Sequence, residues 1–327
     1  MRRACIALAF SLAGCLTEFD PALLGGNGSG GGPGQPSGSC NEVDATCNGL
    51  SCCDSLAVPG GTFSRGFDAT ESATQPGSDD VTGFQSEGAA PATVSPFELD
   101  RFEVTAQRFR HFADNYDGWV ADGHPMAGDG AHPLIDGSGW DDAWPAPAST
   151  DALLAELACG ESATFDTGSD DLRPINCVSW YVGFLFCAWD GGRLPTEAEW
   201  SFAAAGGDEQ RAFPWSSPPE SLVIDSLHAV YGDLPIDAVG SRADLDAGRF
   251  GHHDLAGNVR EWVLDSAGSL TTYPFSEGCS DCAALVAGDK IHRGGDFGAD
   301  ATRARTAYRS ADSREMTSEY VGIRCAR

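Results

Sequence analysis

The stretch that decides the fold is RGGDF at 293–297, near the C-terminal end of a chain of 327 residues. Two longer motifs precede it, GGRLPTEAEW at 191–200 and DLAGNVREW at 254–262. A fourth motif, GIRCA at 322–326, follows it. Four separated motifs in a fixed order are much more specific than any one of them alone.

Together these motifs resemble the formylglycine-generating enzyme, or sulfatase-modifying factor, family, over roughly residues 57–327. The resemblance implies an α+β fold related to C-type lectins. A few short helices and a twisted antiparallel sheet would be embedded in long loops. The 41 glycines and 18 prolines agree with a loop-rich chain.

The family's enzymes bind copper(I) through two cysteine thiolates that follow the Arg-Gly-Gly motif, and they oxidise a substrate cysteine to formylglycine with dioxygen. Ala299 and Ala304 occupy the matching positions here, and no cysteine occurs between 283 and 324. Alanine cannot bind a soft metal ion. We therefore expect neither copper nor any catalytic residue of the family's known type.

Three functions follow from this difference. The first is a non-catalytic envelope protein that binds a protein, peptide or glycan ligand in the cleft, or serves as a scaffold. The second is a formylglycine-type oxidoreductase with altered ligands. The third is another enzyme activity on the same scaffold, with Asp296, Asp300, Arg303 or Arg305 in the cleft.

The turn at 254–261 combines carboxylate and backbone oxygens of the kind that calcium prefers. The matching segment of the family binds calcium. The resemblance gives Asp254 and Glu261 as side-chain ligands and Gly257 and Val259 as backbone ligands. The alternative is a buried turn that Asn258 and Glu261 only cap and cross-link through hydrogen bonds.

The N-terminal residues resemble a bacterial lipoprotein signal, with a positive start, a short apolar stretch and the box Leu12-Ala13-Gly14-Cys15. The prediction is a signal peptide over 1–14 and a lipidated Cys15. A Gly/Ser/Pro-rich tether would follow to residue 39. The localisation expected is the bacterial cell envelope, lipid-anchored to the outer membrane. The alternative is an ordinary signal peptide with an incidental cysteine.

Ten of the twelve cysteines lie beyond the predicted anchor, and an even number in an exported chain indicates disulfides. Segment 40–56 holds four, which favours two local disulfides over a zinc site. Cys279 and Cys282 form a C-x-x-C that favours a structural disulfide over a redox site. The family joins the cysteines that match Cys187 and Cys325, and Cys159 with Cys177 is then the remaining pair.

The net charge of −28 argues against nucleic-acid binding, because an acidic surface repels phosphates. His252 and His253 are adjacent and diverge, so they do not predict a zinc hydrolase. Local patterns predict a strand over 97–104, a helix after Thr105, a helix over 180–189 and a helix from Glu197.

Overall fold

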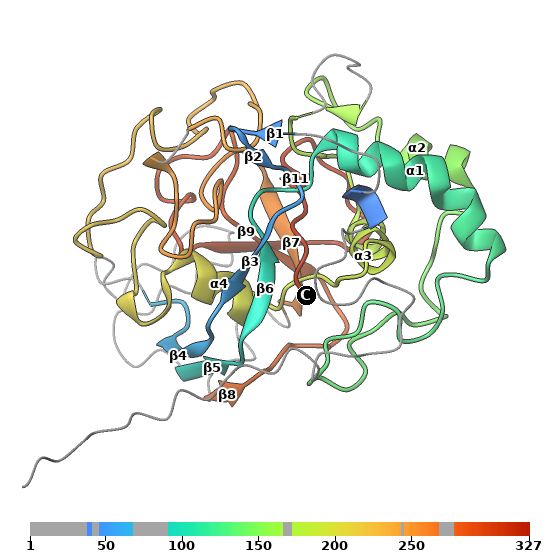
Figure 1. The fold of residues 1–327 in the computed structure, drawn as a ribbon, viewed down its shortest axis with the longest axis horizontal. Helices are drawn as coiled ribbons and strands as arrows, with labels where there is room; N and C mark the ends of the chain where they lie inside the picture. The colour runs from blue at the N-terminus through green and yellow to red at the C-terminus, as the bar shows by residue number, and fades with distance from the viewer. Residues whose placement is uncertain (1–37, 41–45, 68–90, 166–171, 243–244, 268–277) are drawn as a thin grey trace, which may run out of the picture.

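The computed structural model describes residues 38–40, 46–67, 91–165, 172–242, 245–267 and 278–327. Within these ranges the helices and strands are short and separated by long loops (Figure 1). The helical elements are η2 (Gly38–Cys40), α1 (Ala106–Ala121), α2 (Thr150–Glu156), α3 (Trp180–Trp189), α4 (Glu197–Ala204) and η4 (Gly207–Glu209). The strands are β1 (Thr46–Cys47), β2 (Leu50–Ser51), β3 (Ser55–Val58), β4 (Gly61–Ser64), β5 (Pro91–Val94), β6 (Phe97–Asp100), β7 (Arg260–Ser266), β8 (Cys279–Ser280), β9 (Lys290–Arg293), β10 (Arg309–Asp312) and β11 (Val321–Gly322). The predicted loop-rich α+β class is therefore confirmed.

The main helices begin at side chains that can cap them. Thr105 Oγ1 accepts a hydrogen bond from Arg108 N at 3.2 Å at the start of α1, and Ser179 caps α3 in the same way. Thr196 Oγ1 accepts from Glu199 N at 3.1 Å, and Glu199 Oε2 accepts from Thr196 N at 2.8 Å. This is the reciprocal capping box that the sequence predicts for α4.

Two of the sheets are mixed, whereas the pairs β1-β2 and β3-β6 are antiparallel. The largest has the order β10-β9-β7-β11, and β11 runs parallel to β7 while the other pairs are antiparallel. In a second sheet β8 runs parallel to β5. The predicted strand over 97–104 ends at Asp100 as β6. The buried Asp100 carboxylate contacts the guanidinium groups of Arg108 and Arg327 there, and the chain bends at the next residue.

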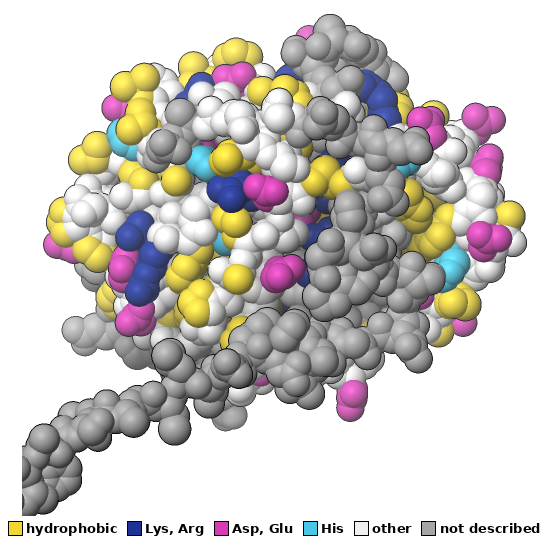
Figure 2. All heavy atoms as spheres, viewed as in Figure 1, with side chains coloured by type: hydrophobic (Ala, Val, Ile, Leu, Met, Phe, Trp, Pro, Cys, Tyr) yellow, Lys and Arg dark blue, Asp and Glu magenta, His cyan; other side chains and the backbone are white. Residues whose placement is uncertain are grey.

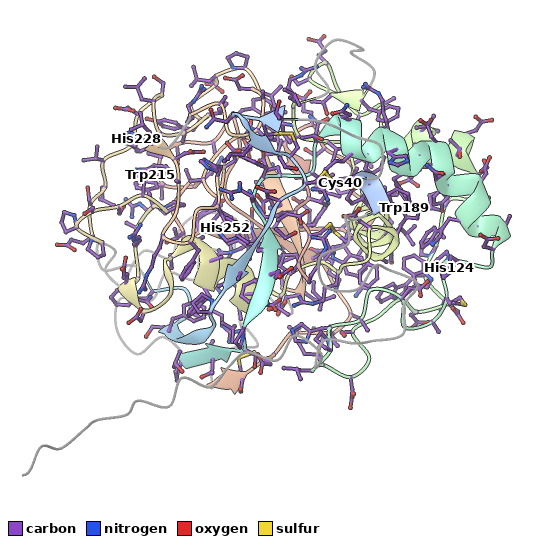
Figure 3. All side chains as sticks on the ribbon, viewed as in Figure 1. Cys40, His124, Trp189, Trp215, His228 and His252 are labelled. Atoms are coloured by element: carbon purple, nitrogen blue, oxygen red, sulfur yellow. A yellow bond between two sulfur atoms is a disulfide. The ribbon has the colours of Figure 1, made fainter. Side chains whose placement is uncertain are left out.

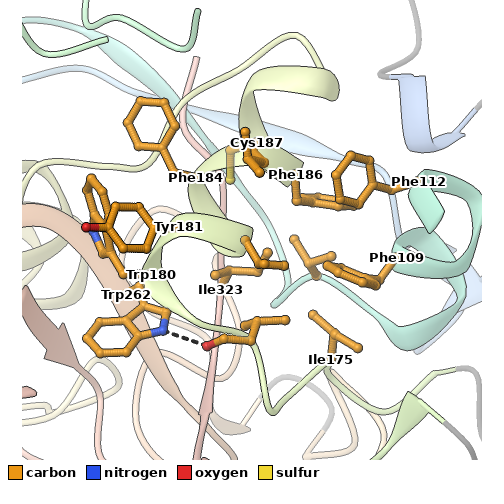
Figure 4. Packing of buried hydrophobic residues seen from close by; sticks show 14 of the residues in the cluster. Phe109, Phe112, Ile175, Trp180, Tyr181, Phe184, Phe186, Cys187, Trp262 and Ile323 are labelled. Atoms are coloured by element: carbon orange, nitrogen blue, oxygen red, sulfur yellow. Dashed lines mark hydrogen bonds between the residues drawn. The ribbon is translucent and has the colours of Figure 1, made fainter. Parts of the chain in front are cut away.

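The main hydrophobic core surrounds α3, which is apolar on nearly all sides and buried (Figure 4). Trp262 of β7 lies against it and donates from Nε1 to Val178 O at 3.0 Å. Ile323 packs on Gly183, where a Cβ would lie 2.6 Å from Ile323 Cγ2. Only glycine therefore lets the C-terminal segment approach α3 this closely.

Five disulfides join all ten cysteines that the described ranges contain. The pairs are Cys40–Cys53, Cys47–Cys52, Cys159–Cys177, Cys187–Cys325 and Cys279–Cys282. The cysteine-rich segment packs on the rest of the fold, since Cys47 and Cys52 lie in a buried cluster with Phe102 and Val239. The bond between Cys187 and Cys325 ties α3 to the end of the chain.

None of the helices in the described part of the chain is both long and apolar enough to cross a membrane. The predicted signal peptide at 1–14, the lipidated Cys15 and the tether up to residue 37 lie outside the described residues.

Candidate functional site

Arg293 holds the loop that contains the family's catalytic positions. Its guanidinium is fully buried and donates to Thr306 O at 2.6 Å, to Ser201 Oγ at 2.7 Å and to Tyr308 O. Gly295 has φ of 71°, and a Cβ there would lie 2.8 Å from Arg303 O. The Arg-Gly-Gly motif thus fixes the path of residues 294–308.

Ala299 and Ala304, which the family resemblance aligns with the copper-binding cysteines, lie inside this loop and are buried. Ala299 N donates to Asp296 O at 2.9 Å, and Ala299 O accepts from Gly232 N at 2.8 Å. Ala304 packs in an apolar cluster with Ala212, Phe213 and Ala256. A methyl group offers no lone pair, so these two side chains do not fit copper(I).

A small pocket lies beside these alanines. It has a volume of about 90 Å³ and is lined by Arg260, Gly295, Asp296, Arg303 and Tyr308. Arg260 Nε lies 2.8 Å from Asp296 Oδ2. Burial raises the pKa of Asp296, and the nearby Arg260 opposes this rise. The pocket is charged, but it is far smaller than the roughly 300–1,000 Å³ of a drug-sized site.

Of the four charged residues that the sequence singles out for the cleft, Asp296 and Arg303 line this pocket and the other two do not. Asp300 is exposed, and its Oδ1 accepts from Thr302 N at 2.9 Å and from Arg303 N at 3.0 Å. It therefore stabilises the turn that carries Ala304. Arg305 lies outside the pocket lining and is half-buried.

A hydrogen-bonded line on β9 and β10 was not predicted from the sequence. His292 Nδ1 lies 3.0 Å from Ser310 Oγ, and His292 Nε2 lies 2.9 Å from Asp312 Oδ2. This bond lowers the pKa of Asp312. Only the register of the two strands brings these residues together, so no local motif signals them. Ser310 is buried, so its hydroxyl group is not open to solvent.

The predicted calcium ligands lie on one tight turn. Asp254 has φ of 58° and Gly257 has φ of 92°, and Asp254 Oδ2 accepts from Gly240 N at 2.6 Å. Both oxygens of Glu261 accept from Arg324, at 2.7–3.1 Å. Outside the strand ladders, no backbone N–H among the described residues donates to the carbonyl oxygens of Gly257 or Val259.

The turn is also cross-linked by hydrogen bonds, as the alternative interpretation expects. Asn258 Nδ2 donates to Glu103 Oε2 at 2.7 Å, and Val259 N donates to Glu103 Oε1 at 3.0 Å. Trp200 Nε1 donates to Glu261 Oε2 at 2.7 Å. Glu103 was not expected at this site, because it lies far upstream in the sequence.

An excess of negative charge is buried around this turn. Glu103, Asp254 and Glu261 lie near the guanidinium of Arg324, and Asp246 Oδ1 lies 2.7 Å from His253 Nδ1. Burial and the charge of Asp246 raise the pKa of Asp254 to about 7. Burial, with Asp254 and Glu261 nearby, raises the pKa of Glu103 well above its usual range. A buried excess of one charge is costly unless the carboxyl groups take up protons or a counter-charge is added.

Only some of the oxygen ligands at the turn are available to bind a hard cation. Asp254 and the carbonyl oxygens of Gly257 and Val259 have capacity left, whereas Glu261 is engaged by Arg324. No group of three or more His, Cys, Asp or Glu side chains in the described ranges could hold a metal ion without other ligands. Backbone oxygens would therefore have to supply part of the coordination, as calcium permits.

The two adjacent histidines lie apart, each with its own partner. His252 Nε2 lies 3.2 Å from Leu99 O, and His253 Nδ1 lies 2.7 Å from Asp246 Oδ1 while its ring stacks on Phe102. Figure 3 labels His252 in the interior of the fold.

These features define a loop-rich α+β protein in which an Arg-Gly-Gly loop closes over a small charged pocket. The family described as "Sulfatase-modifying factor enzyme 1-like domain" matches residues 41–327. The chain belongs to this family, as its motifs predict.

Two relatives illustrate the range of the family. The chain is 27% identical to the formylglycine-generating enzyme of Thermomonospora curvata, over 83% of this chain and 92% of that protein. It is 28% identical to the mouse protein named inactive C-alpha-formylglycine-generating enzyme 2, over 82% of this chain and 84% of that one. The solved structure of PvdO from Pseudomonas aeruginosa shares the fold, with a TM-score of 0.53 and 22% identity over 90% of this chain and 98% of that one.

Proposed function

We propose that this protein is a binding or scaffold member of the family that does not convert cysteine to formylglycine. The observation that carries the proposal is the pair Ala299 and Ala304, which are buried and which the family resemblance aligns with the copper-binding cysteines. Every cysteine in the described ranges is in a disulfide, so none of these offers a replacement thiolate.

The small size of the pocket supports a binding role that does not enclose a substrate. A volume of about 90 Å³ is too small to enclose a peptide, which would have to lie across the mouth of the pocket. A relative whose name calls it inactive agrees with the loss of the family's chemistry in some members. The hypothesis of another enzyme on the same scaffold keeps Asp296 and Arg303, which line the pocket, as its candidate residues.

Copper(I) binding tests the proposal at the site itself. The wild-type protein and the variant Ala299→Cys/Ala304→Cys are titrated with copper(I) against a competing chelator. We expect binding in the double variant alone, because only it has two soft anionic ligands. The proposal would be contradicted if the wild-type protein bound copper(I) tightly and the double variant bound it no more tightly.

We also propose that the protein is anchored to the bacterial envelope through a lipid on Cys15. The box at 12–15 and the Gly/Ser/Pro-rich stretch that follows support this. Mass spectrometry of the protein from its native membrane should find a diacylglyceryl group on an N-terminal Cys15. An unmodified protein that begins elsewhere would defeat this proposal.

A calcium ion is proposed at the acidic turn, held by Asp254 and by the carbonyl oxygens of Gly257 and Val259, with Glu261 shared with Arg324. The buried excess of carboxylates supports it. Ligand binding to the native state alone raises stability by about 2.7 kcal/mol at a free concentration of 100 times Kd. Chelation should lower Tm, calcium should restore it, and Asp254→Ala should abolish the response. Identical melting of the wild type in chelator and in calcium would favour the hydrogen-bonded turn.

A further inference from the structure

The segment 212–233 presents an apolar patch to solvent, beside the loop that contains Ala299 and Ala304. We define this 222–227 patch by three side chains, Leu222, Val223 and Leu227, which are 43%, 63% and 62% exposed. Figure 2 shows hydrophobic side chains gathered on the left of the molecule, where Figure 3 labels Trp215 and His228. Adjacent exposed aliphatic residues are typical of a binding surface.

The patch is held in place by the backbone beneath it. Ser216 Oγ donates to Ser221 O at 2.7 Å, and Trp215 Nε1 donates to Val223 O at 3.0 Å. Leu227 N donates to Asp225 Oδ1 at 2.9 Å. A hydrogen-bonded turn therefore holds these side chains in their exposed positions. Binding of a ligand to them would cost little conformational entropy.

The inner side of the same segment contacts the two alanines of the Arg-Gly-Gly loop. Ile224 and Trp215 pack on the apolar cluster that contains Ala304. Gly232 N donates to Ala299 O at 2.8 Å. The 222–227 patch thus lies on the outward face of the segment whose inward face contacts the two alanines.

The exposed acidic residues of this segment are not matched by lysine or arginine within it, and His228 Nδ1 lies 2.8 Å from Asp225 Oδ1. Residues 212–241 contain no lysine and no arginine. Glu220, Asp225 and Asp233 are exposed within this segment. The charge complement of such a surface is a basic one.

Three other occupants agree less well with these observations. A second copy would bring the same acidic residues face to face. Anionic lipid would be repelled for the same reason. A sugar would need a free aromatic face, but Trp215 is stacked between Phe213 and His228, at 5.3 Å from each.

We propose that the 222–227 patch binds a peptide segment of a partner protein in which aliphatic side chains alternate with lysine or arginine. The aliphatic groups would cover Leu222, Val223 and Leu227, and the basic groups would lie against Glu220 and Asp225. This rests on the proposed binding function and names its ligand class.

A random-peptide phage library selected on the full chain tests the proposal. We expect the enriched peptides to combine aliphatic residues with lysine or arginine and to bind more weakly as salt rises. Val223→Ser/Leu227→Ser should weaken them at least about tenfold, or about 1.4 kcal/mol. The matched control Met126→Ser/Leu134→Ser removes two other exposed aliphatic side chains, 50% and 59% exposed, and should leave binding unchanged.

Four results would overturn the proposal: no enrichment, enriched peptides without basic residues, equal weakening by both variants, or binding that the 223/227 variant leaves intact. If the protein bound phosphatidylglycerol vesicles through the 222–227 patch, the ligand would be a lipid and not a peptide. If the protein formed a dimer through this patch, the ligand would be a second copy of the chain. Aldehyde formation on a cysteine peptide would defeat the proposed function and leave this surface result standing, so the two failures are distinguishable.

Discussion

Removal of the disulfide between Cys187 and Cys325 should cost much more stability than removal of the one between Cys279 and Cys282. The first bond joins residues 138 apart in sequence and the second joins residues 3 apart. In the chain-entropy model, closing the longer loop restricts the unfolded chain far more. The model gives about 5 kcal/mol for the long loop and about 1.6 kcal/mol for the short one.

The assay is urea unfolding at 25 °C of the wild type and of two double variants, Cys187→Ala/Cys325→Ala and Cys279→Ala/Cys282→Ala. Both long-range cysteines are fully buried in the main core, so lost packing adds to the first cost. We expect a difference of about 3 kcal/mol or more between the variants. Equal losses of unfolding free energy would refute the reasoning that loop length sets the cost.

Three further outcomes are expected. Gly257→Ala should lower the free energy of unfolding by at least about 1–3 kcal/mol in a urea titration, because φ is 92° and the new Cβ would lie 2.4 Å from Val230 O; a neutral result would contradict this geometry. Thr196→Ala should cost about 1 kcal/mol by loss of the α4 cap, and Thr196→Ser should restore most of it. Burial raises the pKa of Asp100, but the charges of Arg327 and Arg108 outweigh the effect of burial and hold this pKa well below its usual 3.8. The ionised carboxylate therefore stabilises the native state at neutral pH, and this stabilisation should be lost as the pH drops below about 4. Asp100→Asn should flatten that part of a Tm-against-pH curve.

Local features of the fold were predictable from the sequence because their causes are local. The capping box needs only Thr196 and Glu199, and the buried helix over 180–189 needs only its apolar run and its capping serine. The bond between Cys187 and Cys325, by contrast, came from the family resemblance, since no spacing rule joins residues so far apart. The strand predicted over 97–104 was wrong beyond Asp100, whose ion pairs depend on the tertiary fold.

The candidate site was predictable only where a motif carries it. Ala299 and Ala304 follow from their places after Arg-Gly-Gly, and Asp254 and Glu261 follow from theirs around the turn. Glu103 and the line through His292 could not be found, because distant residues meet there through strand pairing and packing. The exposed patch was missed for another reason: an aliphatic run such as 222–224 indicates a core until its exposure is known.

We propose that this protein lacks the family's chemistry because Ala299 and Ala304 replace two thiolates. The most direct test incubates the purified protein with copper(I), dioxygen and a Cys-x-Pro-x-Arg peptide and follows the peptide by mass spectrometry. An active family member serves as the positive control. The account predicts an unchanged peptide with the wild-type protein, whereas catalytic formation of the aldehyde by that protein would contradict it.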